Sequence, residues 1–289
     1  MSNLTTLLFI IIVSNAGGEG KTLLAQLIQA LLQLAGEPVI MLDGDAGNKA
    51  AWVADDNAKV VGWGVDAIKA TDILAATQGS HVILDLGANS LASAREIVDL
   101  VPALRKTYAG AGYRTIAFLP VSTNKLGAVE AIKALAPKVA GFERVFVKVN
   151  RDGSRAFSGK LEGNDVVEVS HLRPGFQAYI RQAGQTMATA VSQPTAGYGL
   201  AAAYVAEWMR DFAIQVPVLN LLGPMPDVLD QHERPTDVPG FAVQLLEHAT
   251  DVALRENVRR TRVTLAIHKE GWTADGLRRV AALMDAANL

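Results

Sequence analysis

The sequence predicts an α/β fold in which helices cover both faces of a doubly wound, mostly parallel sheet. Strand-length apolar runs recur along the chain, and helix-length amphipathic segments separate them. The runs are continuous rather than alternating in hydropathy, as strands buried on both faces require. They are LLFIIIV (7–13), PVIMLD (38–43), HVILDL (81–86), RTIAFLP (114–120), RVFVKVN (144–150) and DVVEVS (165–170).

The segments between these runs are predicted to be helices. TLLAQLIQALLQLAG (22–36) and SAREIVDLVPALRKTYAGAG (93–112) carry apolar residues at i, i+3 and i+4, and both end in glycine. Strands that alternate with helices favour a parallel sheet with crossover connections. We therefore expect the ligand site at the carboxyl edge of the sheet.

The amino-acid composition of the chain changes after residue 216. Five of the eleven prolines fall between Pro217 and Pro239. We predict one large α/β domain over residues 1–216, followed over 217–289 by a proline-rich connector and a small C-terminal α/β appendage, mainly helical, packed on that domain.

Composition excludes several kinds of site. The chain has no cysteine, so disulfides, thiolate nucleophiles and cysteine-based zinc sites are absent. Its 27 basic and 29 acidic residues nearly cancel, which argues against a protein that is basic throughout. The run Leu7 to Val13 is far shorter than the ~20 residues of a membrane span. We expect a soluble cytoplasmic protein without stable membrane insertion.

The stretch SNAGGEGKT (14–22) follows the first apolar run directly. A strand, a glycine-rich turn and a helix together aim backbone N–H groups and the positive end of the helix at an anion. In such a loop the lysine reaches phosphates and the threonine hydroxyl ligates Mg²⁺. The alternative is a glycine turn with a chance Lys-Thr pair. The predicted nucleotide contacts in this loop are Gly17, Gly18, Glu19, Gly20, Lys21, Thr22 and Leu23.

This loop resembles the deviant Walker A motif, x-K-G-G-x-G-K-[ST], of the ParA/MinD family of P-loop ATPases. MLDGDAGNKA (41–50) is similar to the family's switch I segment, and HVILDLGANS (81–90) to its Walker B and switch II segment. FVKVNRDG (146–153) resembles the strand whose terminal asparagine reads adenine. The resemblance covers roughly residues 5–213, and the phrase DLGANS leans toward the TraL-like and StbB-like plasmid conjugation branch.

The chain departs from the family at Ala16, where the motif has a lysine. In the family, that lysine reaches the partner's phosphates across a nucleotide-sandwich dimer. The resemblance thus implies ATP and Mg²⁺ as cofactors and a homodimer on ATP binding, whereas an alanine implies turnover slowed by about 10³ to 10⁵. Substitute cations are conceivable at three strand ends, namely Lys49, Lys125 and Arg151.

Three aspartates end apolar runs. By resemblance, Asp45 positions or activates the attacking water and, with Lys21, forms the catalytic pair, while Asp43 and Asp85 hold Mg²⁺ together with Thr22. The alternative is that such aspartates cap loops and helices. Glu19 is expected to point outward or to engage a partner subunit.

The base contacts are predicted to come from Asn150 and the stem of Arg151. Guanine recognition through N-K-x-D requires an aspartate at position 153, which is Gly153, so adenine is favoured. The alternative for Asn150 is a strand-end asparagine that forms a turn.

These features predict a ParA-like ATPase with slow or partner-stimulated hydrolysis that positions plasmid DNA or a conjugation or partition complex through a protein adaptor. One alternative is a non-hydrolysing, ATP-dependent assembly module, and a second is a small-molecule transferase on the same fold. A C-terminal basic cluster is a candidate for non-specific DNA binding, with a solvated helix face as its alternative. Its leading members are Arg255, Arg259, Arg260 and Arg262.

Overall fold

The computed structural model describes residues 6–44, 59–60, 69–87, 95–161, 166–172, 176–177, 180, 186–194 and 199–216. The chain divides into two compact units, one of residues 1–171 with 211–223 and the other of residues 172–210 with 224–289. The predicted appendage after residue 216 lies outside the described residues, so the boundary there stays a prediction.

A seven-stranded sheet forms the centre of the first unit, with the strand order β3-β2-β4-β1-β5-β6-β7. Every strand pairing is parallel, which confirms the predicted α/β fold. Each of the six apolar runs forms a strand, and a further two-residue strand, β3, adds an edge. The strands are β1 (Leu8–Ile12), β2 (Val39–Gly44), β3 (Lys59–Val60), β4 (His81–Leu86), β5 (Arg114–Ser122), β6 (Glu143–Val149) and β7 (Val166–Val169).

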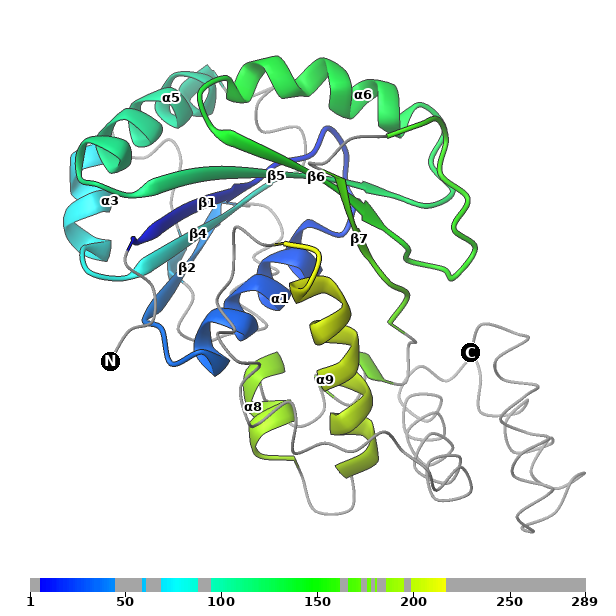
Figure 1. The fold of residues 1–289 in the computed structure, drawn as a ribbon. Helices are drawn as coiled ribbons and strands as arrows, with labels where there is room; N and C mark the ends of the chain where they lie inside the picture. Colours follow the sequence, from blue (N-terminus) through cyan, green and yellow to red (C-terminus); the bar gives the residue numbers. More distant parts are fainter. Residues whose placement is uncertain are drawn as a thin grey trace, which may run out of the picture. The chain divides into compact units, whose positions relative to one another are not determined.

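Helices cover both faces of this sheet. Figure 1 shows α5 and α6 on one side of it and α1 on the other. Coverage of both faces explains why the strand sequences are apolar throughout. The helices of the first unit are α1 (Lys21–Leu34), α3 (Ala70–Thr77), α5 (Arg95–Gly110) and α6 (Ala128–Leu135), and the 3-10 helix η1 (Ala136–Val139) follows α6.

The central strand β1 is buried along its whole length. Phe9 belongs to a hydrophobic cluster with Tyr108 of α5, and the two rings stack with centroids 4.0 Å apart. The Tyr108 hydroxyl lies 2.6 Å from the Thr77 hydroxyl of α3. Burial raises the pKa of Tyr108 to about 12, so this phenol stays protonated and keeps its hydrogen bond over the physiological range.

His81 joins three segments at the opposite edge of the sheet from the strand ends that carry the aspartates. Its Nδ1 accepts a hydrogen bond from the backbone N–H of Leu8 at 3.0 Å, and its Nε2 lies 3.5 Å from the Glu37 carboxylate. Both side chains are buried. Desolvation lowers the pKa of His81 below the ordinary 6.5, and the Glu37 carboxylate offsets only part of that effect. At neutral pH the lowered pKa therefore favours the neutral imidazole of His81 in the folded protein.

The second unit contains α8 (Met187–Ser192) and most of α9 (Gly199–Ala213). The side chain of Thr186 caps α8 by accepting a hydrogen bond from the backbone N–H of Thr189 at 3.2 Å. The ring of Phe176 stacks on Tyr204 with centroids 4.2 Å apart. None of the helices within the described ranges combines the length and hydropathy that a membrane crossing requires.

The buried imidazole predicts that the fold loses stability as the pH falls below about 6.5. The unfolded chain takes up a proton on His81 there, whereas the folded chain resists it because its pKa is depressed. Stability from this source is thus fully present at neutral pH. Urea unfolding at pH 5 and pH 7.5 should show a smaller pH difference for His81→Asn than for the natural protein. An equal difference in both proteins would contradict this role.

Candidate functional site

The loop between β1 and α1 lies at the carboxyl edge of the sheet. Gly18 and Gly20 have φ values of 72° and 83°, in the left-handed region that favours glycine. Gly20 is the residue before the first turn of α1, and no side chain caps that helix. The first N–H groups of a helix lack intrahelical acceptors, and left-handed glycines turn neighbouring N–H groups toward one side. The loop and the start of α1 therefore offer backbone N–H donors suited to an anion.

Lys21 folds back over this loop and is only 8% exposed. Its Nζ donates to Ser14 Oγ at 3.0 Å and to the Ala16 carbonyl at 3.4 Å. Ser14 Oγ in turn donates to the Ala16 carbonyl at 2.8 Å. The first helical residue thus holds a buried ammonium against the loop, on neutral oxygens that a phosphate can replace. The sequence did not indicate the part played by Ser14, although a polar residue directly after a buried strand is a usable signal.

Oxygen ligands suited to a metal meet beside α1. Thr22 Oγ1 donates to Asp85 Oδ2 at 2.8 Å. Asp43 aligns with Asp85 across the parallel β2 and β4, so the two residues share a face of the sheet. Both aspartates are buried. The structure therefore brings together the three residues predicted to hold Mg²⁺, whereas Asp45 and the switch I residues 46–50 lie outside the described residues.

The donor chemistry of this group fits Mg²⁺, which prefers hydroxyl and carboxylate oxygens. Within the described ranges no three His, Cys, Asp or Glu side chains gather in a metal-binding group. A dedicated all-protein cage is not required, because Mg²⁺ keeps several waters and binds substrate phosphates with only one or two carboxylates. The pair Thr22 and Asp85 is thus compatible with a metal that arrives with a nucleotide.

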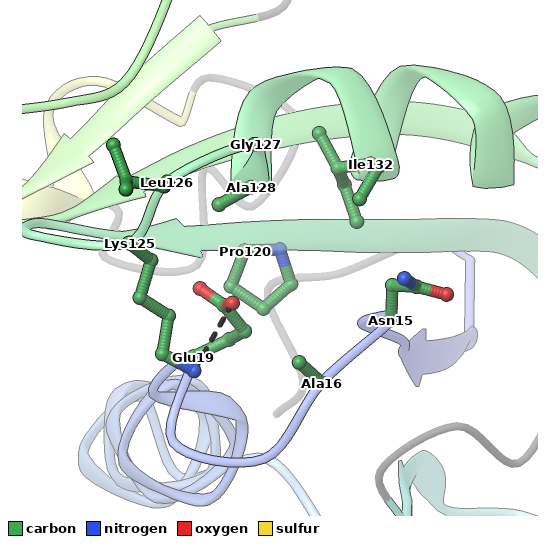
Figure 2. A pocket seen from close by; sticks show the side chains of 10 residues that line it. Asn15, Ala16, Glu19, Pro120, Lys125, Leu126, Gly127, Ala128 and Ile132 are labelled. Carbon is green, nitrogen blue, oxygen red and sulfur yellow. Dashed lines mark ion pairs between the residues drawn. The ribbon is translucent and has the colours of Figure 1, made fainter.

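The prediction that the Glu19 side chain points outward is wrong. It is 4% exposed, and its Oε2 accepts a hydrogen bond from the backbone N–H of Ser122 at 2.7 Å. Its Oε1 forms an ion pair with Lys125 Nζ at 3.2 Å, drawn as the dashed line in Figure 2. A buried carboxylate is tolerated when donors surround it, and these two supply them. The side chain therefore ties the loop to β5, and the predicted nucleotide contact of Glu19 stays a prediction for its backbone N–H.

Two of the three candidate substitute cations lie against the loop. Lys125 Nζ donates to the carbonyl oxygen of Gly17, and Arg151 Nη1 donates to that of Gly18 at 2.7 Å. Lys125 follows β5 and Arg151 follows β6, as the sequence places them. Lys49 lies outside the described residues.

Asn150 is buried and forms hydrogen bonds close to its own turn. Its Oδ1 accepts a hydrogen bond from the backbone N–H of Arg155 at 3.3 Å, and its backbone N–H donates to the carbonyl oxygen of Val169 at 3.0 Å. This arrangement fits the alternative of a turn-forming asparagine. Base contacts by Asn150 and Arg151 stay predictions.

A pocket of about 240 Å³ adjoins the loop on the side of α6. The ion pair of Glu19 and Lys125 lies at one end of it, and Leu126, 99% exposed, lies beside it (Figure 2). The remaining lining is mainly apolar. The lining residues are Asn15, Ala16, Glu19, Pro120, Lys125, Leu126, Gly127, Ala128, Ala131 and Ile132.

Comparison with known proteins finds no matching family model and no matching curated protein. Among solved structures, the cell division ATPase MinD of Pyrococcus furiosus is similar at 17% identity and a TM-score of 0.46, over 73% of this chain and 99% of that one. The septum site-determining protein MinD of Pyrococcus horikoshii, complexed with Mg-ADP, is similar at 17% identity and a TM-score of 0.44 over the same shares.

Chloroplast FtsY of Physcomitrella patens is also similar, at 17% identity and a TM-score of 0.40 over 54% of this chain. The match spans 53% of that FtsY chain, about half of its length. At such identities and TM-scores, the likeness does not extend to activity or ligand.

The close approach of the loop to β6 gives a testable consequence. A Cβ on Gly20 would lie 2.8 Å from Val149 Cγ1, whereas a Cβ on Gly36 would meet nothing within 4 Å. Both glycines have positive φ, so both alanine variants carry the left-handed cost of about 1–2 kcal/mol. Gly20→Ala adds a steric cost of about 1–3 kcal/mol. Urea unfolding should show Gly20→Ala to be less stable than Gly36→Ala, and equal losses would contradict the close contact between loop and strand.

Proposed function

We propose that this chain is an ATP-binding switch of the ParA/MinD kind, with slow or partner-stimulated hydrolysis. One observation supports it above the others. The buried Lys21 ammonium and the Thr22 hydroxyl, consecutive at the start of α1, lie over the glycine loop and against the Asp85 carboxylate respectively. A cation for phosphates beside oxygen ligands for a metal is the arrangement that a magnesium nucleotide requires.

The phosphates are proposed to lie against the backbone N–H groups of the glycine loop. The N–H groups at the start of α1 donate to phosphate oxygens, and Lys21 exchanges its bonds to the neutral oxygens of Ser14 and Ala16 for stronger ones to charged phosphate oxygens. Thr22, Asp43 and Asp85 would hold Mg²⁺, the two aspartates through its waters, and the metal would supply positive charge against the phosphates.

Hydrolysis is proposed to use Asp45 to position the attacking water. The Ala16 side chain offers no hydrogen-bond donor and no charge. Turnover by the chain alone is therefore slower by about 10³- to 10⁵-fold, the factor that comparable cations contribute. A partner or a second copy then sets the rate. The adenine preference rests on Gly153, which cannot make the contacts that guanine recognition needs.

The wider role is proposed from the resemblance alone. An ATP-bound homodimer in the cytoplasm positions plasmid DNA or a conjugation or partition complex, through a protein adaptor or through the basic cluster of Arg255, Arg259, Arg260 and Arg262. The second candidate is an assembly module that binds ATP without hydrolysing it. Ala16 favours that candidate, whereas Asp43, Asp45 and Asp85 favour the ATPase.

Titration calorimetry with Mg-ATP tests the nucleotide site. Lys21→Ala should weaken binding by about 10- to 100-fold, because a charge-assisted contact is worth about 1.5–3 kcal/mol. Lys106→Ala is the matched control, since Lys106 is exposed on α5. Natural protein that gives no binding at millimolar Mg-ATP would remove the proposal.

Measurements of ATP turnover and of oligomer mass in the presence of Mg-ATP separate the two candidate functions. The switch predicts a dimer that depends on ATP and on Lys21, low basal turnover, and faster turnover in Ala16→Lys because the missing cation is restored. ATP-dependent dimers without hydrolysis, unchanged by Ala16→Lys and by duplex DNA, support the assembly module instead. Monomers in every condition contradict both.

A further inference from the structure

Two cations contact carbonyl groups of the glycine loop. Lys125 and Arg151 follow different strands, yet each donates to a loop carbonyl, those of Gly17 and Gly18 respectively. Neither carbonyl carries a formal charge, so these contacts are not ion pairs. Each contact holds the carbonyl of one peptide group toward a cation.

Peptide geometry converts the position of a carbonyl into the direction of an amide. In a trans peptide the C=O and the following N–H point in opposite directions, and no peptide bond of the described residues is cis. A carbonyl of Gly17 held toward Lys125 thus turns the N–H of Gly18 the other way. In the same manner, a carbonyl of Gly18 held toward Arg151 turns the N–H of Glu19 away from Arg151.

Both cations are themselves held in place. Lys125 pairs with Glu19 at 3.2 Å. The backbone N–H of Arg151 donates to Thr123 Oγ1 at 3.2 Å. The turn after β6 is fixed further by Asp152, whose carboxylate accepts from the Ser154 backbone N–H at 3.0 Å and from its hydroxyl at 2.7 Å. The donors therefore reach the loop from anchored positions.

The fit between cations and loop is close. A Cβ on Gly18 would lie 3.1 Å from Arg151 Nη1 and 3.5 Å from Lys125 Nζ. This contact distance and the positive φ of Gly18 both favour glycine there. A loop bounded in this way has little freedom to rotate its peptide groups.

We propose that Lys125 and Arg151 are positioning residues that hold the N–H groups of Gly18 and Glu19 toward the phosphates of a bound nucleotide. The inference rests on the proposed function for the ligand, but the preset amides are a property of the ligand-free protein. A cation on a carbonyl also polarises that peptide group, which makes its N–H a stronger donor. The charged ends of Lys125 and Arg151 thus act through the backbone, without touching the phosphates.

Affinity for two nucleotides tests this role. Arg151→Ala and Lys125→Ala should each raise the Kd by about 10-fold, and equally for Mg-ADP and Mg-ATP, because the amides serve phosphates present in both. Arg151→Lys should recover most of the affinity, since it keeps a cationic donor. Arg144→Ala is the control, because Arg144 is exposed at the other end of β6. A loss confined to Mg-ATP indicates direct contact with the terminal phosphate and overturns the proposal, as does unchanged affinity.

A ligand-free measurement keeps the inference separate from the proposed function. In ¹H–¹⁵N spectra without nucleotide, Arg151→Ala should shift the Glu19 amide upfield and Lys125→Ala the Gly18 amide, because each loses its polarising partner. Arg151→Lys and Arg144→Ala should leave both resonances near their natural positions. Loop amides unmoved by either alanine variant overturn the inference, whether or not the natural protein binds nucleotide.

Discussion

The hydrogen bond between the Glu19 carboxylate and the backbone N–H of Ser122, 2.7 Å long, ties the glycine loop to the sheet. The two residues are 103 positions apart, so this bond joins the first strand–helix connection to the end of β5. Removing a partner from such a buried bond leaves an unsatisfied group at a cost of about 1–3 kcal/mol. The same carboxylate positions Lys125, and through it the Gly17 carbonyl. The tie between loop and sheet, the placement of Lys125 and the direction of the Gly18 amide thus depend on one buried acid.

The parallel sheet makes this convergence possible. Because β2, β4, β1, β5 and β6 all run in one direction, the segments that follow them meet at one edge. Asp43 and Asp85 reach that edge on one side of the loop, and Lys125 and Arg151 reach it on the other. Acids that suit a metal and cations that suit a loop carbonyl are therefore separated by the loop itself.

The sequence predicted the fold and the strand–glycine-loop–helix connection of the candidate site because both depend on local signals. Apolar runs and glycines are visible in any window of the chain, whereas the two residues of β3 carry no period. The orientation predicted for Glu19 is wrong because a charged residue in a glycine turn is usually exposed to solvent. No local signal indicates its hydrogen bond with the backbone N–H of Ser122. Arg151 was placed at the correct edge, but its reach to Gly18 depends on the register of β6 beside β5. A local sequence pattern does not identify the long-range partner of a single side chain.

A crystal structure with a magnesium ATP analogue tests most directly whether the loop grips phosphate through its amides. We expect phosphate oxygens within hydrogen-bond distance of the N–H groups of residues 18–22, with Lys21 Nζ moved from Ser14 and the Ala16 carbonyl onto the phosphates. Glu19 should still accept from Ser122, and both cations should still contact their carbonyls. A nucleotide bound elsewhere, or a loop whose carbonyls face the phosphates, would contradict this mode of binding.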